Sequence, residues 1–351
     1  MSDIKPSTKL LIKTFVYCFF IFFFMILFCS NNSFLYDSNS VNNYMVGKLY
    51  NHGRFIPFLL EILSNTILLF SSYRIFRLFV NKYTSKICIP LILVSIVTCN
   101  SFLNGGTSVE FILSLVMVCF YYYFRHFKKK MLVNKEMFLC GILAGITFIV
   151  DYYLIGMFIG FGLFITLDYF INRHQKKNGM KRLSSYLFGF ILSVGIICLL
   201  EYSFYDFNSF LESYFVDRFN FNLSNYRVIL TNIWNLGFFN YWLIILSPIL
   251  LFKWNINGFS KIGIIVMLLL MILGIYINYY DNNCLLLLSY FIIGLLGICI
   301  FFDDMLIDFI KYYYKGIVVF ITIISILLCI FGANNIDSIN LLNNGLIIFK
   351  K

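Results

Sequence analysis

Charged residues are scarce in this chain: Asp, Glu, Lys and Arg together make up 12% of its 351 residues. A soluble domain carries about a quarter of its residues as these four types, so roughly half of the charge that a water-facing surface needs is missing. This scarcity excludes an ordinary soluble globular protein. With 61% hydrophobic residues and a mean hydropathy of +0.86, the composition is typical of a membrane protein.

Several catalytic motifs are also missing. The sequence has no Walker-type phosphate loop, H-E-x-x-H, G-x-S-x-G or dinucleotide-binding fingerprint, and its three histidines are scattered. These absences argue against an ATPase, a metalloprotease and a serine hydrolase. The ten cysteines form no C-x-x-C pair and lie almost entirely in apolar runs, so we interpret them as small buried hydrophobes. The sequence indicates no cofactor and leaves a requirement for a divalent metal open.

Long apolar runs separated by polar clusters predict an all-α membrane protein with a single transmembrane domain, residues 1–351. At about 20 residues per crossing, the chain has no room for a separate soluble domain. The eleven predicted crossings are residues 11–29, 57–72, 87–103, 111–124, 137–150, 153–171, 184–202, 239–252, 262–278, 285–302 and 316–332. The fourth, fifth and eighth are short for a hydrocarbon core about 30 Å thick, which predicts tilt, a kink or partial re-entry.

The basic residues are distributed unevenly between the two sides of these crossings. Of the 27 Lys and Arg residues, 21 fall on one side and 6 on the other. Because the Lys- and Arg-rich side of a membrane protein faces the cytoplasm, we expect the N-terminus inside and, after eleven crossings, the C-terminus outside. The net charge of +11 is then mainly a topology signal and not a nucleic-acid-binding surface.

The acidic residues gather mainly on the opposite, outer side. That side has two long loops, 30–56 and 203–238, which are the first and fourth outer loops, and a short glycine-rich loop, 104–110. Within the fourth loop, aromatic residues between 205 and 219 recur at near-helical spacing and predict an interfacial amphipathic helix. Such a helix either covers a lipid-linked substrate or merely rests on the membrane. We therefore expect any chemical site on the outer face.

Three carboxylates stand out by position: Asp37 in the first outer loop, Glu110 at the start of the fourth crossing, and Asp151 between the fifth and sixth. A carboxylate near hydrocarbon is desolvated, which raises its pKa and suits it to act as a base toward a hydroxyl. The simpler alternative is a solvated loop charge for Asp37 and a charge favoured by the helix dipole for Glu110. Asp151 either caps a turn or faces a cavity.

Three stretches of the sequence carry a family resemblance. The first is Tyr36-Asp37, followed by a helical aromatic stretch and then by Gly53 and Pro57. The second is Gly105–Glu110 (GGTSVE), which leads into the fourth crossing. The third is Gly141-x-x-x-Gly145, which lies in the fifth crossing. Together they resemble the polytopic GT-C glycosyltransferases, particularly the bacterial branch similar to protein mannosyltransferases and aminoarabinose transferases. The resemblance covers residues 1–171 and leaves 184–351 as a variable helical half.

The resemblance implies transfer of a sugar from a polyprenyl-phosphate donor to an envelope glycan, lipid or protein acceptor on the extracytoplasmic face of the cell membrane. Asp37 would then be the general base and Glu110 a second carboxylate of the site. The candidates for binding the donor phosphate or sugar are Lys48, His52, Arg54, Asp151, Arg218 and Arg227. The chain departs from the family where Ser38 replaces a second acid, where Pro57 stands alone, and where Asp151 replaces a basic residue.

Two other functions fit the same sequence. A polysaccharide polymerase or ligase is also polytopic with a large outer loop, and in such an enzyme Arg218 and Arg227 would matter more than Asp37. A lipid-linked glycan transporter or flippase predicts internal repeats and charges at mid-membrane. No clear repeat is present, and the charges that bear on a site cluster at the outer edge of the membrane.

Overall fold

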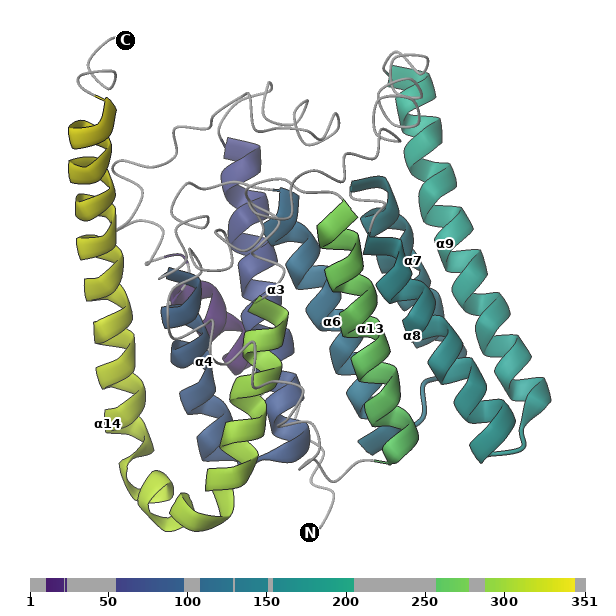
Figure 1. Cartoon of the computed structure of the whole chain (residues 1–351), viewed down its shortest axis with the longest axis horizontal. Coiled ribbons are helices and arrows are strands. Elements are labelled where there is room, and N and C mark those ends of the chain that lie inside the picture. The colour runs from purple at the N-terminus through teal and green to yellow at the C-terminus, as the bar shows by residue number, and fades with distance from the viewer. Residues whose placement is uncertain are drawn as a thin grey trace.

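The described part of the chain is a bundle of helices. The computed structural model describes residues 11–21, 23, 55–97, 108–128, 130–150, 154–204, 257–277 and 288–344. Every regular element within these ranges is helical, and no strand occurs among them. The helices stand side by side, with α14 on one flank and α9 on the other (Figure 1). The prediction of an all-α protein is confirmed for these residues.

The helices follow the predicted apolar runs closely. They are α3 (Phe55–Phe79), α4 (Lys82–Val97), α6 (Ser108–Lys128), α7 (Asn134–Val150), α8 (Ile155–Leu167), the π-helix η3 (Asp168–Asn172), α9 (Lys176–Phe204), α13 (Gly258–Ile277) and α14 (Leu288–Asn344). Residues 11–21 form a further helix. The predicted crossing at 239–252 lies outside the described residues.

The fourth predicted crossing, 111–124, lies within a longer helix. Helix α6 has 21 residues and is about 31 Å long at 1.5 Å per residue. It continues past its apolar run, and its basic side chains lie against aromatic rings at the helix end. The Arg125 guanidinium is 5.1 Å from the ring centre of Tyr122, and the Lys128 Nζ is 5.4 Å from that of Phe79.

Two of the described helices are long and apolar enough to cross a membrane, namely Ile155–Asn172 and Lys176–Leu200. Shorter apolar helices occur at Leu11–Ile21, Gly258–Gly274 and Leu288–Ile300. On α9 the side chains of Phe188, Ile191 and Leu199 are each more than 60% exposed, so this helix presents a broad apolar face outward. The predicted total of eleven crossings stays a prediction.

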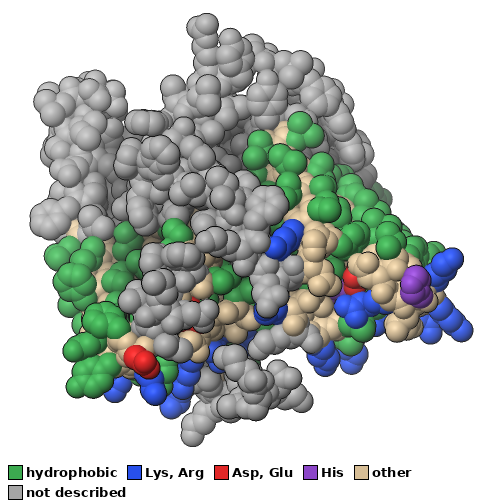
Figure 2. All heavy atoms as spheres, turned by 60° about the horizontal axis from the view of Figure 1, so that its bottom comes forward, with side chains coloured by type: hydrophobic (Ala, Val, Ile, Leu, Met, Phe, Trp, Pro, Cys, Tyr) green, Lys and Arg blue, Asp and Glu red, His purple; other side chains and the backbone are tan. Residues whose placement is uncertain are grey.

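The connections that join α3 to α4, α6 to α7 and η3 to α9 all lie at one end of the bundle, which we call the basic end (Figure 1). Figure 2 turns this end toward the viewer and shows Lys and Arg side chains along it, with apolar side chains beyond. The described basic residues near these connections are Arg74, Arg77, Lys82, Lys86, Arg125, Lys128, Lys130, Lys135, Arg173, Lys176, Lys177, Lys181 and Arg182.

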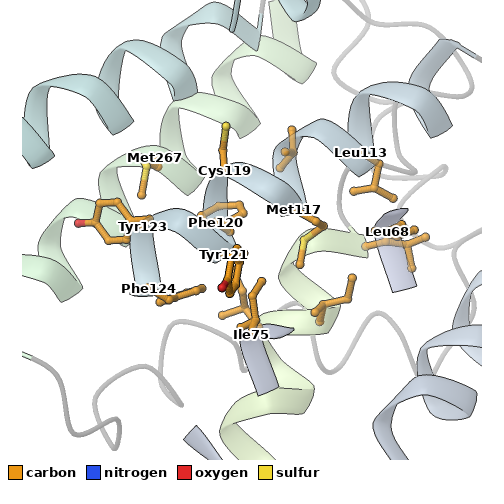
Figure 3. Packing of buried hydrophobic residues seen from close by; sticks show 14 of the residues in the cluster. Leu68, Ile75, Leu113, Met117, Cys119, Phe120, Tyr121, Tyr123, Phe124 and Met267 are labelled. Carbon is orange, nitrogen blue, oxygen red and sulfur yellow. The ribbon is translucent and has the colours of Figure 1, made fainter. Parts of the chain in front are cut away.

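Helix α6 lies at the centre of the packing. Figure 3 shows Met117, Phe120 and Tyr123 of α6 in one buried cluster with Leu68 of α3 and Met267 of α13. Phe120 and Tyr123 are at most 1% exposed, and the Tyr123 hydroxyl donates to the backbone carbonyl of Ser260 over 3.0 Å. The interior is therefore apolar and dense, and α6 joins α3 on one side to α13 on the other.

Helices α7 and α9 approach each other closely because small residues line their contact. A Cβ added at Gly141 would stand 2.0 Å from the backbone oxygen of Tyr186, and one added at Gly189 would stand 2.2 Å from that of Phe138. The spacing Gly141-x-x-x-Gly145 faces the spacing Gly189-x-x-x-Ser193, a pattern typical of tightly packed helices in membranes. The glycine pair of the family resemblance therefore has a packing role here.

Helix α14 reverses direction. The Cys299 and Cys88 sulfurs are 3.4 Å apart, and the Ser325 hydroxyl is 3.4 Å from the backbone oxygen of Pro90. Twenty-six residues of straight helix would span about 39 Å, whereas Cys88 and Pro90 are two residues apart on α4. The chain must therefore turn back between these contacts, as the ribbon does at the basic end (Figure 1). The predicted crossings at 285–302 and 316–332 correspond to the two limbs.

Candidate functional site

Most of the predicted site residues lie outside the described part of the chain. These are Asp37, Lys48, His52, Arg54, Asp151, Arg218 and Arg227. Glu110 is placed by its backbone, in the first turn of α6. That turn is at the end of the bundle opposite the basic end (Figure 1). The first turn of a helix has unpaired backbone N–H groups and a partial positive charge, so anionic groups are stabilised there.

At the basic end, the structure reveals a buried polar cluster around His126 and Asp168. The His126 Nε2 is 2.9 Å from the Asp168 Oδ2, and Arg173 Nε is 2.6 Å from the same oxygen. The other carboxylate oxygen accepts from Asn172 Nδ2 over 2.9 Å. The side chains of His126 and Asp168 are 0% and 3% exposed, whereas that of Arg173 is 28% exposed, so the His126–Asp168 pair is shielded from water and Arg173 lies at its outer side.

The local backbone explains how these groups meet. The wide turn of η3 brings Asn172 and Arg173 back toward Asp168, whose backbone oxygen accepts from the Arg173 N–H over 3.2 Å. His174 has a positive φ of 52° and ends this turn, and the next N–H, that of Gln175, donates to the Tyr169 carbonyl over 2.8 Å. Helix α9 then begins in the opposite direction.

Both ring nitrogens of His126 are occupied. Its Nδ1 accepts from the Leu132 backbone N–H over 3.2 Å, so its Nε2 carries the proton and donates to Asp168. Burial lowers the pKa of His126, which favours this neutral form. The imidazole has no free nitrogen for a substrate proton. The pair therefore positions the connection between α6 and α7 and does not act as a base.

Further contacts hold the same connection. The Arg182 Nε donates to the Leu132 carbonyl over 2.7 Å, and the Tyr169 hydroxyl donates to the same oxygen over 3.3 Å. Glu136 pairs with Arg125 and accepts from the Val133 backbone N–H over 3.0 Å, which caps the start of α7. The basic charges of this end are thus partly structural.

A second buried carboxylate, Asp303, joins α14 to the start of α4. Its Oδ2 accepts from the Asn81 backbone N–H over 3.0 Å and from the Asn81 Nδ2 over 2.8 Å. Its Oδ1 accepts from the Thr84 hydroxyl over 2.5 Å. Asp303 therefore satisfies an N-terminal backbone donor of α4 from a segment more than 200 residues away.

Sequence reasoning missed both clusters. The sequence shows His126 only as one of three scattered histidines, whereas the structure places it buried in the last turn of α6. His126 and Asp168 are 42 residues apart, so no local spacing links them. The one available signal was Asp168 itself, because a carboxylate at the end of an apolar run needs a partner.

The thiols agree with their interpretation as buried hydrophobes. The structure shows no disulfide at the cysteines whose side chains it describes, and four of them, Cys18, Cys88, Cys119 and Cys140, are buried. In the same part, no three His, Cys, Asp or Glu side chains form a group that could hold a metal ion.

No protein-family model, no curated protein and no solved structure matches this chain. Function must therefore be argued from the residues themselves, and the two ends of the bundle differ in what they offer. The basic end is occupied by structural pairs and lysines. The opposite end holds the first turn of α6 with Glu110.

Proposed function

We propose that the protein is a membrane glycosyltransferase that moves a sugar from a polyprenyl-phosphate donor to an envelope acceptor on the extracytoplasmic face. One observation carries the proposal most directly. Helix α6 begins at Ser108, within the predicted glycine-rich loop 104–110, so Glu110 stands in its first turn at the end of the bundle away from the basic end. This is the placement that the GT-C resemblance implies for the second carboxylate.

The proposal includes an arrangement in the membrane, with eleven crossings and the basic end in the cytoplasm. The apolar helices Ile155–Asn172 and Lys176–Leu200 support it, as does the gathering of Lys and Arg at one end. With that orientation the first turn of α6 is extracytoplasmic. The outer loops 30–56 and 203–238 would then surround the same face.

The chemistry needs one base and one stabilised leaving group. Asp37 accepts the proton of the acceptor hydroxyl while that oxygen bonds to the anomeric carbon of the sugar. The bond from this carbon to the phosphate oxygen breaks, and its electron pair leaves with polyprenyl phosphate. Lys48, His52, Arg54, Arg218 and Arg227 are the candidates for stabilising that charge.

Substitution of Asp37 tests the proposal. Membrane vesicles carrying the protein receive undecaprenyl phosphate linked to a tritiated hexose, one hexose at a time, and the label transferred to envelope material is counted. Loss of a general base costs typically 10²- to 10⁴-fold in rate, so we expect Asp37→Asn to lose at least about 100-fold and Asp37→Glu to keep part of the activity.

The matched control is Asp308→Asn, which removes the same charge from an exposed position in α14. It should transfer label at the wild-type rate, and all variants should insert to equal levels. Wild-type activity in Asp37→Asn would contradict the catalytic role of Asp37. Loss in Arg218 and Arg227 variants with Asp37→Asn unaffected would favour a polymerase or ligase.

A further inference from the structure

A cavity of about 420 Å³ lies at the basic end between three helices: the helix 11–21, α4 and the second limb of α14. Each helix contributes one lysine to it, namely Lys13, Lys86 and Lys315. The rest of its lining is mainly apolar and aromatic, with Tyr17 and Val318 among it. Neither the proposed transferase site nor the clusters around His126 and Asp303 include this cavity.

The three lysines give the cavity a positively charged lining. Among the described residues that line the cavity there is no carboxylate. Burial lowers the pKa of Lys86, and the positive charges of Lys82, Arg77 and Lys315 lower it further. Its Nζ lies 5.4 Å from the ring centre of Tyr314, which offers partial compensation. Lysines from three separate helices therefore line one cavity without a carboxylate among its described lining residues, and a bound anion would relieve the repulsion between Lys86 and Lys315.

The cavity continues into an apolar surface. Ile89 forms its fully buried wall, while Val319 is 57% exposed on the outside of α14. Next along the same helix, Phe320 and Ile323 are 63% and 50% exposed. An elongated apolar group could leave the cavity along these side chains. A small inorganic anion would not contact these apolar side chains.

We propose that this cavity binds an anionic phospholipid, with its phosphate held by Lys13, Lys86 and Lys315 and an acyl chain lying against Val318 and Val319. Basic pockets between helices at the cytoplasmic side of a membrane protein are suited to anionic headgroups. The cationic side chains of the cavity are lysines and not arginines. A lysine ammonium group acts as a point charge, so it can bind the phosphate diester of a lipid without the fixed bidentate geometry that a guanidinium group favours. The proposal depends on the bundle lying in a membrane, and it is independent of glycosyl transfer.

The test measures lipid binding to the full-length protein by native mass spectrometry from a mild non-ionic detergent. The probes are dioleoyl phosphatidylglycerol, dioleoyl phosphatidylcholine and inorganic phosphate, each titrated at constant ionic strength. We expect phosphatidylglycerol to bind and phosphatidylcholine to bind at least tenfold more weakly. Displacement of phosphatidylglycerol by millimolar inorganic phosphate would instead indicate a site for a free anion and would overturn the lipid assignment.

Paired lysine variants supply the decisive comparison. Lys86→Gln with Lys315→Gln removes two cavity charges, whereas Lys82→Gln with Lys311→Gln removes two charges one helical turn away, from residues that do not line the cavity. At about 1 kcal/mol per lysine, the first pair should weaken phosphatidylglycerol binding roughly 30-fold. The second pair should bind as the wild type does. Equal weakening by both pairs would show a general surface-charge effect and would refute the site.

A variant that keeps all charges tests the site even if the double lysine variant fails to fold. Val318→Trp fills the apolar part of the cavity and leaves all three lysines in place. It should weaken phosphatidylglycerol binding at least tenfold, with an unchanged melting temperature, and unchanged binding would contradict the acyl-chain contact. The transferase variant Asp37→Asn should bind the lipid normally, so failure of either proposal can be recognised separately.

Discussion

At the scale of single residues, the buried carboxylates are the informative groups. Asp168 accepts hydrogen bonds from His126, Asn172 and Arg173, and Asp303 accepts from Asn81 and Thr84. A buried charge without partners costs several kcal/mol, so each of these acids needs its donors. Their roles follow from contacts made across the fold, and they are structural. The catalytic carboxylate of the proposed function is a different residue, Asp37.

Removing the Asp168 carboxylate should destabilise the protein. Asp168→Ala leaves the buried Nε2–H of His126 without an acceptor and the guanidinium of Arg173 without its carboxylate partner. We therefore expect the free energy of unfolding to fall by about 3 kcal/mol. SDS titration of the purified protein, followed by circular dichroism, measures this. Asp308→Ala, at an exposed position, is the control and should change stability by less than about 0.5 kcal/mol. Equal stability of the two variants would contradict the structural role of Asp168.

At the scale of elements, small residues and polar contacts decide which helices pair. Helix α9 approaches α7 along Gly189, whereas Gly195 on the same helix has no atom within 4 Å of the place that a Cβ would take. The sequence shows both glycines in one apolar run and does not distinguish them. Only the packing of α7 against α9 makes the first one critical, because its neighbour there is backbone that cannot move aside.

Two alanine substitutions on α9 test this packing. Gly189→Ala places a methyl group 2.2 Å from the Phe138 carbonyl oxygen, so we expect a loss of about 2 kcal/mol or more in the free energy of unfolding. Gly195→Ala meets nothing and should be neutral or stabilising by up to about 1 kcal/mol, because alanine favours the helix. The same SDS titration compares the two. An unaffected Gly189→Ala variant would mean that α7 and α9 are not in this contact.

At the scale of the whole molecule, the distribution of charge is the main organising feature. The basic residues gather at the end where α3 meets α4, α6 meets α7 and η3 meets α9, and the outward side chains of α9 are apolar. The proposed orientation places this end in the cytoplasm. It would place the lysine-lined cavity and the first turn of α6 on opposite faces of the membrane.

Reporter fusions test this orientation. Alkaline phosphatase fused after Asn42, following one predicted crossing, should be active, and fused after Lys177, following six, should be inactive. Green fluorescent protein at the same two positions should show the reverse pattern. Active phosphatase after Lys177 would contradict the proposed topology, and with it an extracytoplasmic position for Glu110.

The sequence by itself determined the helical class, most helix positions and the basic end, because apolar runs and charge asymmetry are local properties that need no knowledge of packing. It named Asp37 and Glu110 as candidates through a resemblance, and that assignment stays a prediction. Only the tertiary structure decided that His126 meets Asp168, that both limbs of α14 pack against α4, and that Lys13, Lys86 and Lys315 share one cavity. These contacts join residues from 42 to about 300 positions apart, and they depend on which helix faces fit together, which hydrophobic periodicity alone does not specify.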